Sequence, residues 1–209
     1  MLTELRERII RTSLELFESS GFHGVTVNKI VKESGTSKGG FYHYFQSKDE
    51  LLFVIHDSFI SYVLSKAQEA IATNEPPSAK MQKIIKSFVK VFDLYKPHIS
   101  VFYQENIYLK PHYKEAVRQK RNLYKETIFS VIREGIDKGE FRPELPVEIT
   151  GMSILGMVNW SYKWYRRDGE KSIEEIGDIY VDLILHSLLC LENGIRTEYR
   201  DYFLSNISE

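Results

Sequence analysis

The chain of 209 residues contains a single cysteine, Cys190, and this scarcity excludes several classes of protein. One cysteine cannot form an internal disulfide framework or a cysteine-rich zinc site. The six histidines show no His-x-x-x-His spacing or similar arrangement of metal ligands. We therefore expect no metal site and no resident cofactor.

Long hydrophobic runs and a large net charge are also missing. No apolar run approaches the ~20 residues that a membrane-spanning helix needs, and the charged segment from Met1 to Arg8 lacks the apolar core of a signal peptide. The 28 basic residues nearly balance the 29 acidic residues. The sequence predicts a cytoplasmic protein with no membrane partner and without the excess positive charge of a polycation.

Residues 26–45 predict two short helices joined by a tight turn, which is the plan of a DNA-binding helix-turn-helix. Thr26 can cap the first helix, and Ser34-Gly35 supplies its end. The apolar side of this helix has the spacing i, i+3, i+4 and consists of Val27, Ile30 and Val31.

The second helix combines a buried aromatic side with a polar side. Either Thr36 or Ser37 can cap it. Its apolar residues follow the same helical spacing and are Phe41, Tyr44 and Phe45. The residues expected to point outward, where base edges are contacted, are Ser37, Lys38, Gly39, Gly40, Tyr42 and His43.

The glycine pair Gly39-Gly40 needs an explanation, because each glycine costs roughly 0.5 to 1 kcal/mol in a helix compared with alanine. One explanation is close approach to a nucleic-acid backbone. The other is that the glycines loosen the first turn or let it pack against the preceding helix. Both explanations stay open from the sequence.

The local charge agrees with DNA binding. Between Lys29 and Lys48 there are four lysines and the single acid Glu33. Lys29 and Lys32 are equally compatible with an ordinary solvated surface. Lys38 and Lys48 lie at predicted helix starts, where free N–H groups and the helix dipole favour phosphate. This segment predicts a basic face that binds DNA in a salt-sensitive manner.

Residues 21–52, GFHGVTVNKIVKESGTSKGGFYHYFQSKDELL, resemble the TetR family of transcriptional repressors. The resemblance implies that Thr26, Tyr42 and Lys48 contact the DNA backbone. It also places Ser37, Lys38, Gly39 and His43 where the family contacts bases or lies close to them. Its further implication is a homodimer on a palindromic operator in double-stranded DNA.

The rest of the chain predicts helices throughout, with no convincing alternation of strand type and no internal repeat. We therefore expect an all-α protein of about nine helices, with a three-helix DNA-binding domain at 1–46 and a ligand-binding and dimerisation domain at 47–209. Capping boxes are predicted at Ser47 and Ser172. Residues 195–209 are compatible with either an extra helix or a frayed tail. The expected later helices are 47–74, 78–95, 97–108, 112–138, 147–165 and 172–193.

The helices expected at 147–165 and 172–193 are unusually apolar for surface elements. A helix that is apolar on most of its circumference needs a second surface to cover it. A twofold dimer through a four-helix interface meets this need, and the family resemblance implies the same arrangement. The alternative is a monomer whose own core absorbs both helices. The predicted interface residues are Leu155, Tyr162, Ile179, Leu183, Ile184 and Leu188.

The segment Gly156–Gly169 gathers aromatic, amide and cationic side chains near one helix end. Its Asn-Trp followed by Trp-Tyr-Arg resembles the acyl-CoA-responsive branch of TetR regulators. Tryptophan and tyrosine are also common interface residues, so this segment has a purely structural interpretation as well. The predicted ligand-binding residues are Phe92, Phe102, Tyr103, Asn106, Tyr124, Ile128, Asn159, Trp160, Lys163, Trp164, Arg166 and Arg167.

The predicted function is that of a DNA-binding repressor of fatty-acid degradation genes, released from its operator by a small effector such as a fatty acyl-CoA. The alternative is a TetR-type regulator of an efflux or detoxification gene that responds to a lipophilic drug. A more distant alternative is an enzyme acting on acyl thioesters, because His186 and Cys190 lie four residues apart. No third orienting group accompanies this pair, so we do not expect an enzyme.

Overall fold

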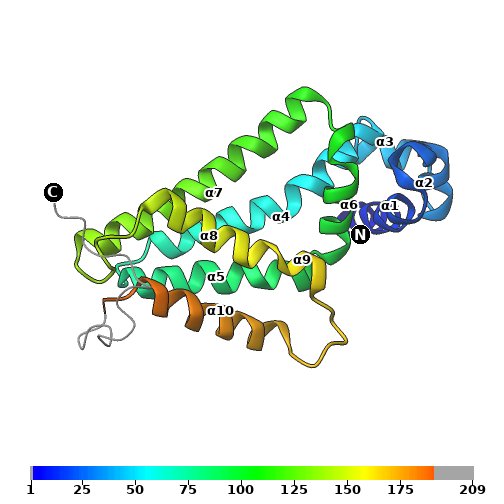
Figure 1. Cartoon of the computed structure of the whole chain (residues 1–209). Helices are drawn as coiled ribbons and strands as arrows, with labels where there is room; N and C mark the ends of the chain where they lie inside the picture. The colour runs from blue at the N-terminus through cyan, green and yellow to red at the C-terminus, as the bar shows by residue number, and fades with distance from the viewer. Residues whose placement is uncertain (1, 191–209) are drawn as a thin grey trace. The chain divides into compact units, whose positions relative to one another are not determined.

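In a computed structural model of the chain, the structure describes residues 2–190, with side chains from residue 4 onward, and these residues are all-α. They form ten α-helices and one 3-10 helix, and nine of the α-helices have seven or more residues, in line with the predicted fold (Figure 1). The helices are α1 (Leu2–Gly24), α2 (Val27–Glu33), α3 (Lys38–Tyr44), α4 (Lys48–Ile71), α5 (Pro77–Leu94), α6 (Lys96–Glu105), η1 (Asn106–Tyr108), α7 (Pro111–Asp137), α8 (Val147–Asn159), α9 (Ser161–Trp164) and α10 (Ile173–Leu188).

Three of the expected helices differ from those observed. The helix expected at 97–108 ends as an α-helix at Glu105 and is followed by the 3-10 helix η1. The single helix expected at 147–165 is divided into α8 and α9 at Trp160, and Tyr165 is extended. The helix expected to reach residue 193 ends at Leu188, because Leu189 adopts an extended conformation and pairs with Phe141. The prediction for residues 195–209 lies outside the described residues.

The described chain divides into two compact units. Within residues 2–190, the first comprises residues 2–62 and 94–121, and the second comprises residues 63–93 and 122–190. The long helices α4 and α7 each contribute to both units. The boundary at residue 46 was predicted on functional grounds and stays a prediction.

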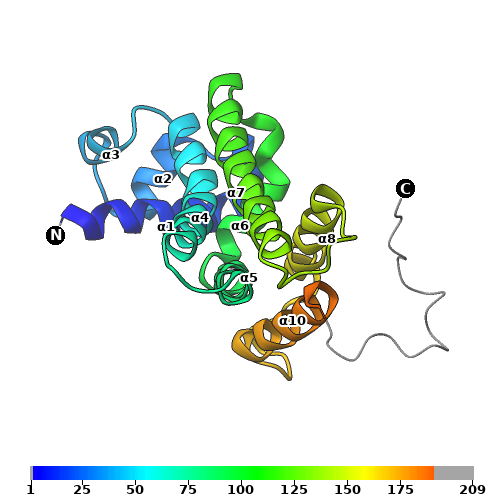
Figure 2. The same ribbon diagram turned by 90° about the vertical axis from the view of Figure 1, so that its left-hand side faces the viewer.

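The first unit is organised around one apolar core, and Figure 2 shows α2 and α3 on the same side of α1. Gly21 interrupts α1 with φ 67°, a conformation that favours glycine. The buried Ser13 hydroxyl donates a hydrogen bond to the Ile9 carbonyl oxygen at 2.7 Å, so it causes no unpaired polar group in the core. The core residues come from α1 to α4, α6 and their connections: Ile9, Ile10, Leu14, Phe17, Phe22, Val25, Ile30, Phe41, Phe45, Leu51, Leu52, Ile55, Val101 and Leu109.

The second unit packs its helices closely where glycines remove side chains. A Cβ atom at Gly151 of α8 would collide with the ring of Phe129 on α7, and one at Gly135 would collide with Phe141. The nearly buried Lys80 ammonium pairs with the Glu134 carboxylate at 2.9 Å. None of the helices within residues 2–190 is long and apolar enough to cross a membrane.

Candidate DNA-binding and effector sites

Local hydrogen bonds build the first half of the helix-turn-helix. The Thr26 hydroxyl accepts a hydrogen bond from the Lys29 backbone N–H at 3.2 Å, which confirms Thr26 as the N-cap of α2. The helix ends at Ser34, whose backbone N–H donates to the Ile30 carbonyl. Gly35 then turns the chain with φ 61°, a conformation that favours glycine. This sequence of a cap, a short helix and a glycine fixes the turn before α3.

Helix α3, the second helix of the helix-turn-helix, is capped by Ser37 rather than by Thr36. The Ser37 hydroxyl accepts a hydrogen bond from the Gly40 backbone N–H at 3.0 Å. Phe41 and Phe45 are buried in the first unit's core, and Tyr44 packs against that core while remaining half-buried. The predicted aromatic side of this helix is therefore confirmed.

The opposite side of α3 faces outward and is polar. Ser37, Lys38, Gly39, Tyr42 and His43 are exposed, with 52% of Tyr42 accessible. Thr26, at the start of α2, is exposed as well. Of the eight residues predicted to contact DNA, these six are exposed, while Gly40 and Lys48 are half-buried. The assignment of all eight to DNA contact stays a prediction.

The two glycines of α3 have different surroundings. A Cβ atom at Gly40 would collide with the Thr36 hydroxyl oxygen, so packing inside the turn requires glycine there. A Cβ atom at Gly39 would meet only the Ser37 hydroxyl oxygen, at an ordinary 3.7 Å. Internal packing therefore explains Gly40 and leaves Gly39 without a structural requirement.

Lys48 is held inside the first unit. Its ammonium donates hydrogen bonds to the carbonyl oxygens of Phe22 and Val25, each at 2.6 Å, and lies 4.1 Å from the centre of the Phe22 ring. Burial lowers the pKa of Lys48, and the nearby carboxylates of Asp49 and Glu105 partly oppose this effect. The side chain thus joins the start of α4 to the end of α1, an arrangement that its helix-start position alone does not indicate.

Helices α8 to α10 of the second unit carry an exposed apolar surface. Its most exposed side chain is Ile149, at 68%, and Leu183 is 52% exposed. Of the predicted interface residues, Ile179 and Leu183 are exposed, Leu155 and Tyr162 are half-buried, and Ile184 and Leu188 are buried within the subunit. We call the following residues the apolar surface: Ile149, Met152, Met157, Trp160, Trp164, Ile179 and Leu183.

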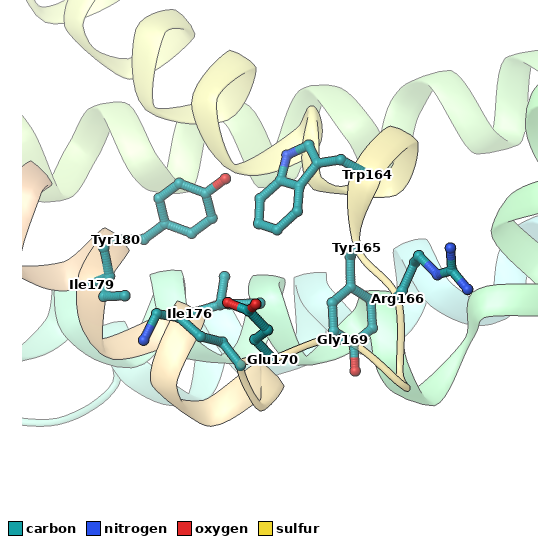
Figure 3. Close-up of a pocket in the computed structure, with 9 residues that line it drawn as sticks. Trp164, Tyr165, Arg166, Gly169, Glu170, Ile176, Ile179 and Tyr180 are labelled. Carbon is teal, nitrogen blue, oxygen red and sulfur yellow. The ribbon is translucent and has the colours of Figure 1, made fainter.

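A pocket of about 440 Å³ lies between α9, the loop that follows it and α10, all within the second unit (Figure 3). Its aromatic and aliphatic lining comes from Trp164, Tyr165, Ile176, Ile179 and Tyr180. The remaining lining residues belong to the loop and are Arg166, Gly169, Glu170 and Lys171.

Only two predicted ligand residues, Trp164 and Arg166, line this pocket. The other seven lining residues were not among the predicted ligand-binding residues. The capping box at Ser172, which fixes where α10 begins, was the available signal for the loop side of the pocket.

The other predicted ligand residues are distributed over both units. Phe102, Tyr103 and Asn106 belong to the first unit, and the rest belong to the second. Phe92, Phe102, Tyr124 and Ile128 are buried, and the Tyr124 hydroxyl lacks a hydrogen-bond partner within the described residues. Asn159 is half-buried, whereas Tyr103, Asn106, Trp160 and Lys163 are exposed. Their assignment to an effector stays a prediction.

Arg167 is bound to α5 instead of projecting freely. Its guanidinium donates one hydrogen bond to the Asp93 carboxylate and one to the Asp93 backbone carbonyl, both at 2.7 Å. The Tyr165 hydroxyl donates to the same carboxylate at 3.0 Å. The Arg167 bonds, supported by Tyr165, lower the pKa of Asp93, and burial together with this carboxylate raises the pKa of Tyr165 to about 12. These bonds attach the start of the loop to the body of the second unit.

The histidine and cysteine considered for catalysis are both exposed. The His186 Nδ1 atom lies 2.8 Å from the Asp182 carbonyl oxygen, one turn back on α10. Cys190 lies beyond the end of α10, and its backbone N–H donates to the Glu140 carbonyl. The expected continuous helix that would place the two residues on one face is therefore absent.

Family models match most of the chain. A model of bacterial regulatory proteins of the TetR family matches residues 9–55, and a model of the tetracyclin repressor-like C-terminal domain matches residues 74–188. The chain belongs to the TetR family of bacterial transcriptional regulators. Proteins of this class are regulators rather than enzymes.

Two curated relatives extend over nearly the same length. The HTH-type transcriptional repressor KstR2 of Mycobacterium tuberculosis strain H37Rv is 22% identical over 181 residues, covering 86% of this chain and 90% of that protein. The fatty acid metabolism regulator protein of Bacillus subtilis strain 168 is 23% identical over 186 residues, covering 87% of this chain and 94% of that protein.

Solved structures share the fold. The ketosteroid transcriptional regulator KstR2 of M. tuberculosis superposes with a TM-score of 0.78 at 20% identity, covering 89% of this chain and 95% of that one. AibR, solved in complex with isovaleryl coenzyme A and operator DNA, superposes with a TM-score of 0.71 at 22% identity, covering 86% and 96%. At these identities the likeness establishes the fold alone.

Proposed function

We propose that this protein is a transcriptional repressor that binds a palindromic operator as a homodimer and is released by a fatty acyl-CoA. The observation that carries the DNA-binding part is the two-sided character of α3. Phe41 and Phe45 anchor the helix in the core, while Ser37, Lys38 and His43 face outward. A short helix with a polar outer side, preceded by a capped helix and a tight turn, suits insertion into the major groove.

Affinity for DNA is proposed to depend on Lys38. This lysine is exposed at the first position of α3, where the helix dipole also favours a phosphate group. In a gel-shift assay with promoter fragments from the protein's own locus, Lys38→Gln should weaken binding. Lys90→Gln, which removes an exposed lysine from α5 in the second unit, should leave binding unchanged. Equal binding by the wild type and both variants would refute the proposed role of Lys38.

The apolar surface on α8 to α10 supports the homodimer. So many large apolar side chains exposed on neighbouring helices are unfavourable in water and are typical of an interface. Light scattering after size-exclusion chromatography should give the mass of a dimer at micromolar concentration, and Leu183→Glu should shift the mass toward the monomer. A wild-type monomer under these conditions would refute the dimer, and with it the palindromic operator.

The acyl-CoA effector is supported by the aromatic and basic residues around α9 and by the relatives. One relative is named a fatty acid metabolism regulator, and one protein of the same fold was solved with isovaleryl coenzyme A. Binding equilibria are reciprocal, so an effector that prefers a conformation with wrongly spaced DNA-binding helices must weaken operator binding. Half-sites are about 34–36 Å apart, which tolerates little change in spacing.

Calorimetry with purified protein tests the effector. Acyl-CoAs of graded chain length should bind and should release operator DNA in a parallel gel shift. If no acyl-CoA binds and an uncharged lipophilic drug does, the acyl-CoA proposal is wrong and the regulator of an efflux or detoxification gene takes its place.

A further inference from the structure

The beginning of α1 lies beside α3 in the first unit and brings an arginine to the end of that helix. The guanidinium carbon of Arg6 is 5.7 Å from the centre of the ring of Phe45, the residue that ends α3. The adjacent Leu5 side chain is 3.7 Å from the position that a Cβ atom at Gly40 would occupy. A cation from a different helix therefore flanks the helix-turn-helix, and it was not among the predicted DNA contacts.

The charge of Arg6 is available to a partner. Arg6 is exposed, and it forms no ion pair with any acid in the part of the chain that the structure describes. The acid next to it in the sequence, Glu7, does not face it, because adjacent positions on a helix point in different directions. Lys48, which follows α3, instead donates hydrogen bonds to two backbone carbonyls of the first unit. Of these two cations, Arg6 is the one left for a ligand.

The length of α3 connects this arginine to DNA. With seven residues at ~1.5 Å each, the helix is ~10 Å long, and the major groove is ~12 Å wide. A charge at either end of an inserted α3 therefore lies near the sugar–phosphate backbone that borders the groove. Lys38 occupies the first position of the helix, and Arg6 lies beside its end. We propose that Arg6 binds an operator phosphate at the end of α3 opposite to Lys38, an inference that rests on the proposed insertion of α3 into the groove.

The chemistry of arginine suits this contact. A guanidinium can donate two parallel hydrogen bonds to one phosphate group. The Phe45 ring restricts the Arg6 side chain beforehand, so less rotamer entropy is lost when a phosphate binds. Phosphates carry no sequence information, so Arg6 should add equally to the affinity for the operator and for an unrelated duplex. If Arg6 only covers Phe45, its substitution should affect stability and leave the salt dependence of DNA binding unchanged.

Fluorescence anisotropy of the full-length protein at graded salt concentrations tests the contact. The probes are a labelled promoter fragment from the protein's own locus and an unrelated duplex of equal length. Arg6→Gln removes the charge, and Arg6→Lys keeps it. The matched control is Arg11→Gln, which removes another exposed arginine of α1 and changes the net charge equally. Arg11 lies five positions further along α1 and therefore off the row of side chains that contains Arg6. Thermal unfolding followed by circular dichroism verifies that each variant is folded.

Arg6→Gln should make the slope of log affinity against log salt shallower by about 0.9 on both duplexes and should weaken binding to both by the same factor. Arg6→Lys and Arg11→Gln should keep the wild-type slope. An unchanged slope in Arg6→Gln, an equal change in Arg11→Gln, or a loss confined to the promoter fragment would each overturn the proposal.

The unrelated duplex separates this contact from the repressor function. A wild type that binds the promoter fragment no more tightly than the unrelated duplex would contradict the proposed repressor. The comparison of Arg6→Gln with the wild type on the unrelated duplex would still decide whether Arg6 contacts a phosphate. Absence of wild-type binding to either duplex would contradict both.

Discussion

The DNA-binding region and helices α8 to α10 bury apolar residues to very different degrees. Among residues 4–46, Tyr42 is the one large hydrophobic side chain that is strongly exposed, and the core beneath it is fully buried. In α8 to α10, by contrast, seven large hydrophobic residues are exposed. The first region buries its apolar residues in a core shared with α4 and α6, and it offers polar groups to a charged partner. The second leaves apolar area uncovered, as expected of a region that binds another protein surface.

This comparison indicates that a region's exposed chemistry reveals its partner better than its helix content does. Both regions are helical, and both contain glycines where helices pack closely. They differ in what remains on the surface once the core is formed. Four measurements test how the buried and exposed parts of the molecule differ.

The largest effect on stability is expected when substitutions on the buried side of α3 are compared with substitutions on its outer side. Phe41→Ala removes a fully buried ring and should lower the free energy of unfolding of the first unit by about 3 to 5 kcal/mol. Tyr42→Ala, at the neighbouring exposed position, should change stability by less than about 0.5 kcal/mol while weakening operator binding. Thermal unfolding followed by circular dichroism, with a gel shift, measures both. Comparable destabilisation by the two variants would show that the buried and outer sides are wrongly assigned.

A second measurement tests the buried histidine of the first unit. Burial lowers the pKa of His56 from 6.5 to about 4, so between these values the unfolded chain binds a proton that the folded chain does not. The contribution of His56 is therefore complete above pH 6.5, and stability falls as the pH drops toward 4, by about 2 kcal/mol at pH 5. Urea unfolding at pH 7 and pH 5 should show a smaller difference for His56→Leu than for the wild type. An identical difference in both would contradict this account.

Substitution of Lys48 should lower the free energy of unfolding by about 1 kcal/mol. The same variant distinguishes two roles for this lysine, an internal link and a contact with DNA phosphate. Lys48→Met removes the hydrogen bonds to the Phe22 and Val25 carbonyls, and we expect a loss of about 1 kcal/mol in unfolding free energy. If the lysine acts only as this internal link, the salt dependence of operator binding should be unchanged. A slope of log affinity against log salt that becomes shallower by about 0.9 would instead show a phosphate contact, as the sequence predicts.

The smallest effect is expected at the attachment of the loop to α5. Asp93→Asn weakens the interactions with Arg167 and Tyr165, and partly exposed pairs of this kind contribute less than about 1 kcal/mol. Because Arg167 holds the pKa of Asp93 low, any stabilisation is present above the ordinary pKa of the carboxyl and is lost as the pH falls through the lowered value. Chemical denaturation at pH 7 would measure the change, and a loss of several kcal/mol would be inconsistent with a surface link.

The sequence predicted local features most accurately where short-range hydrogen bonds decide the structure. Thr26 and Ser172 cap their helices as expected, and the aromatic spacing of α3 identified its buried side. The family resemblance added the functional class, which the family models then established. Such features depend on residues only three or four positions apart, so they are visible in a linear sequence.

Features that depend on distant residues were not predictable in the same way. The hydrogen bonds of Lys48 join it to residues 26 and 23 positions earlier, and Arg167 reaches back 74 positions to Asp93. The break at Trp160 divides a segment whose hydrophobic spacing resembles one continuous helix. The pocket lies beside the break at Trp160 and beside the loop that Arg167 attaches to α5, so the sequence identified only two of its lining residues.

The missing side chain at Gly151 restricts how the second unit can change shape. Because the Phe129 ring occupies the space where a side chain would stand, turning α8 about its axis would drive a neighbouring residue into that ring. This contact fixes the rotation of α8 relative to α7, and we expect the two helices to move together where they touch. We therefore expect a displacement of this part of α7 to carry α8 and its exposed apolar side chains with it.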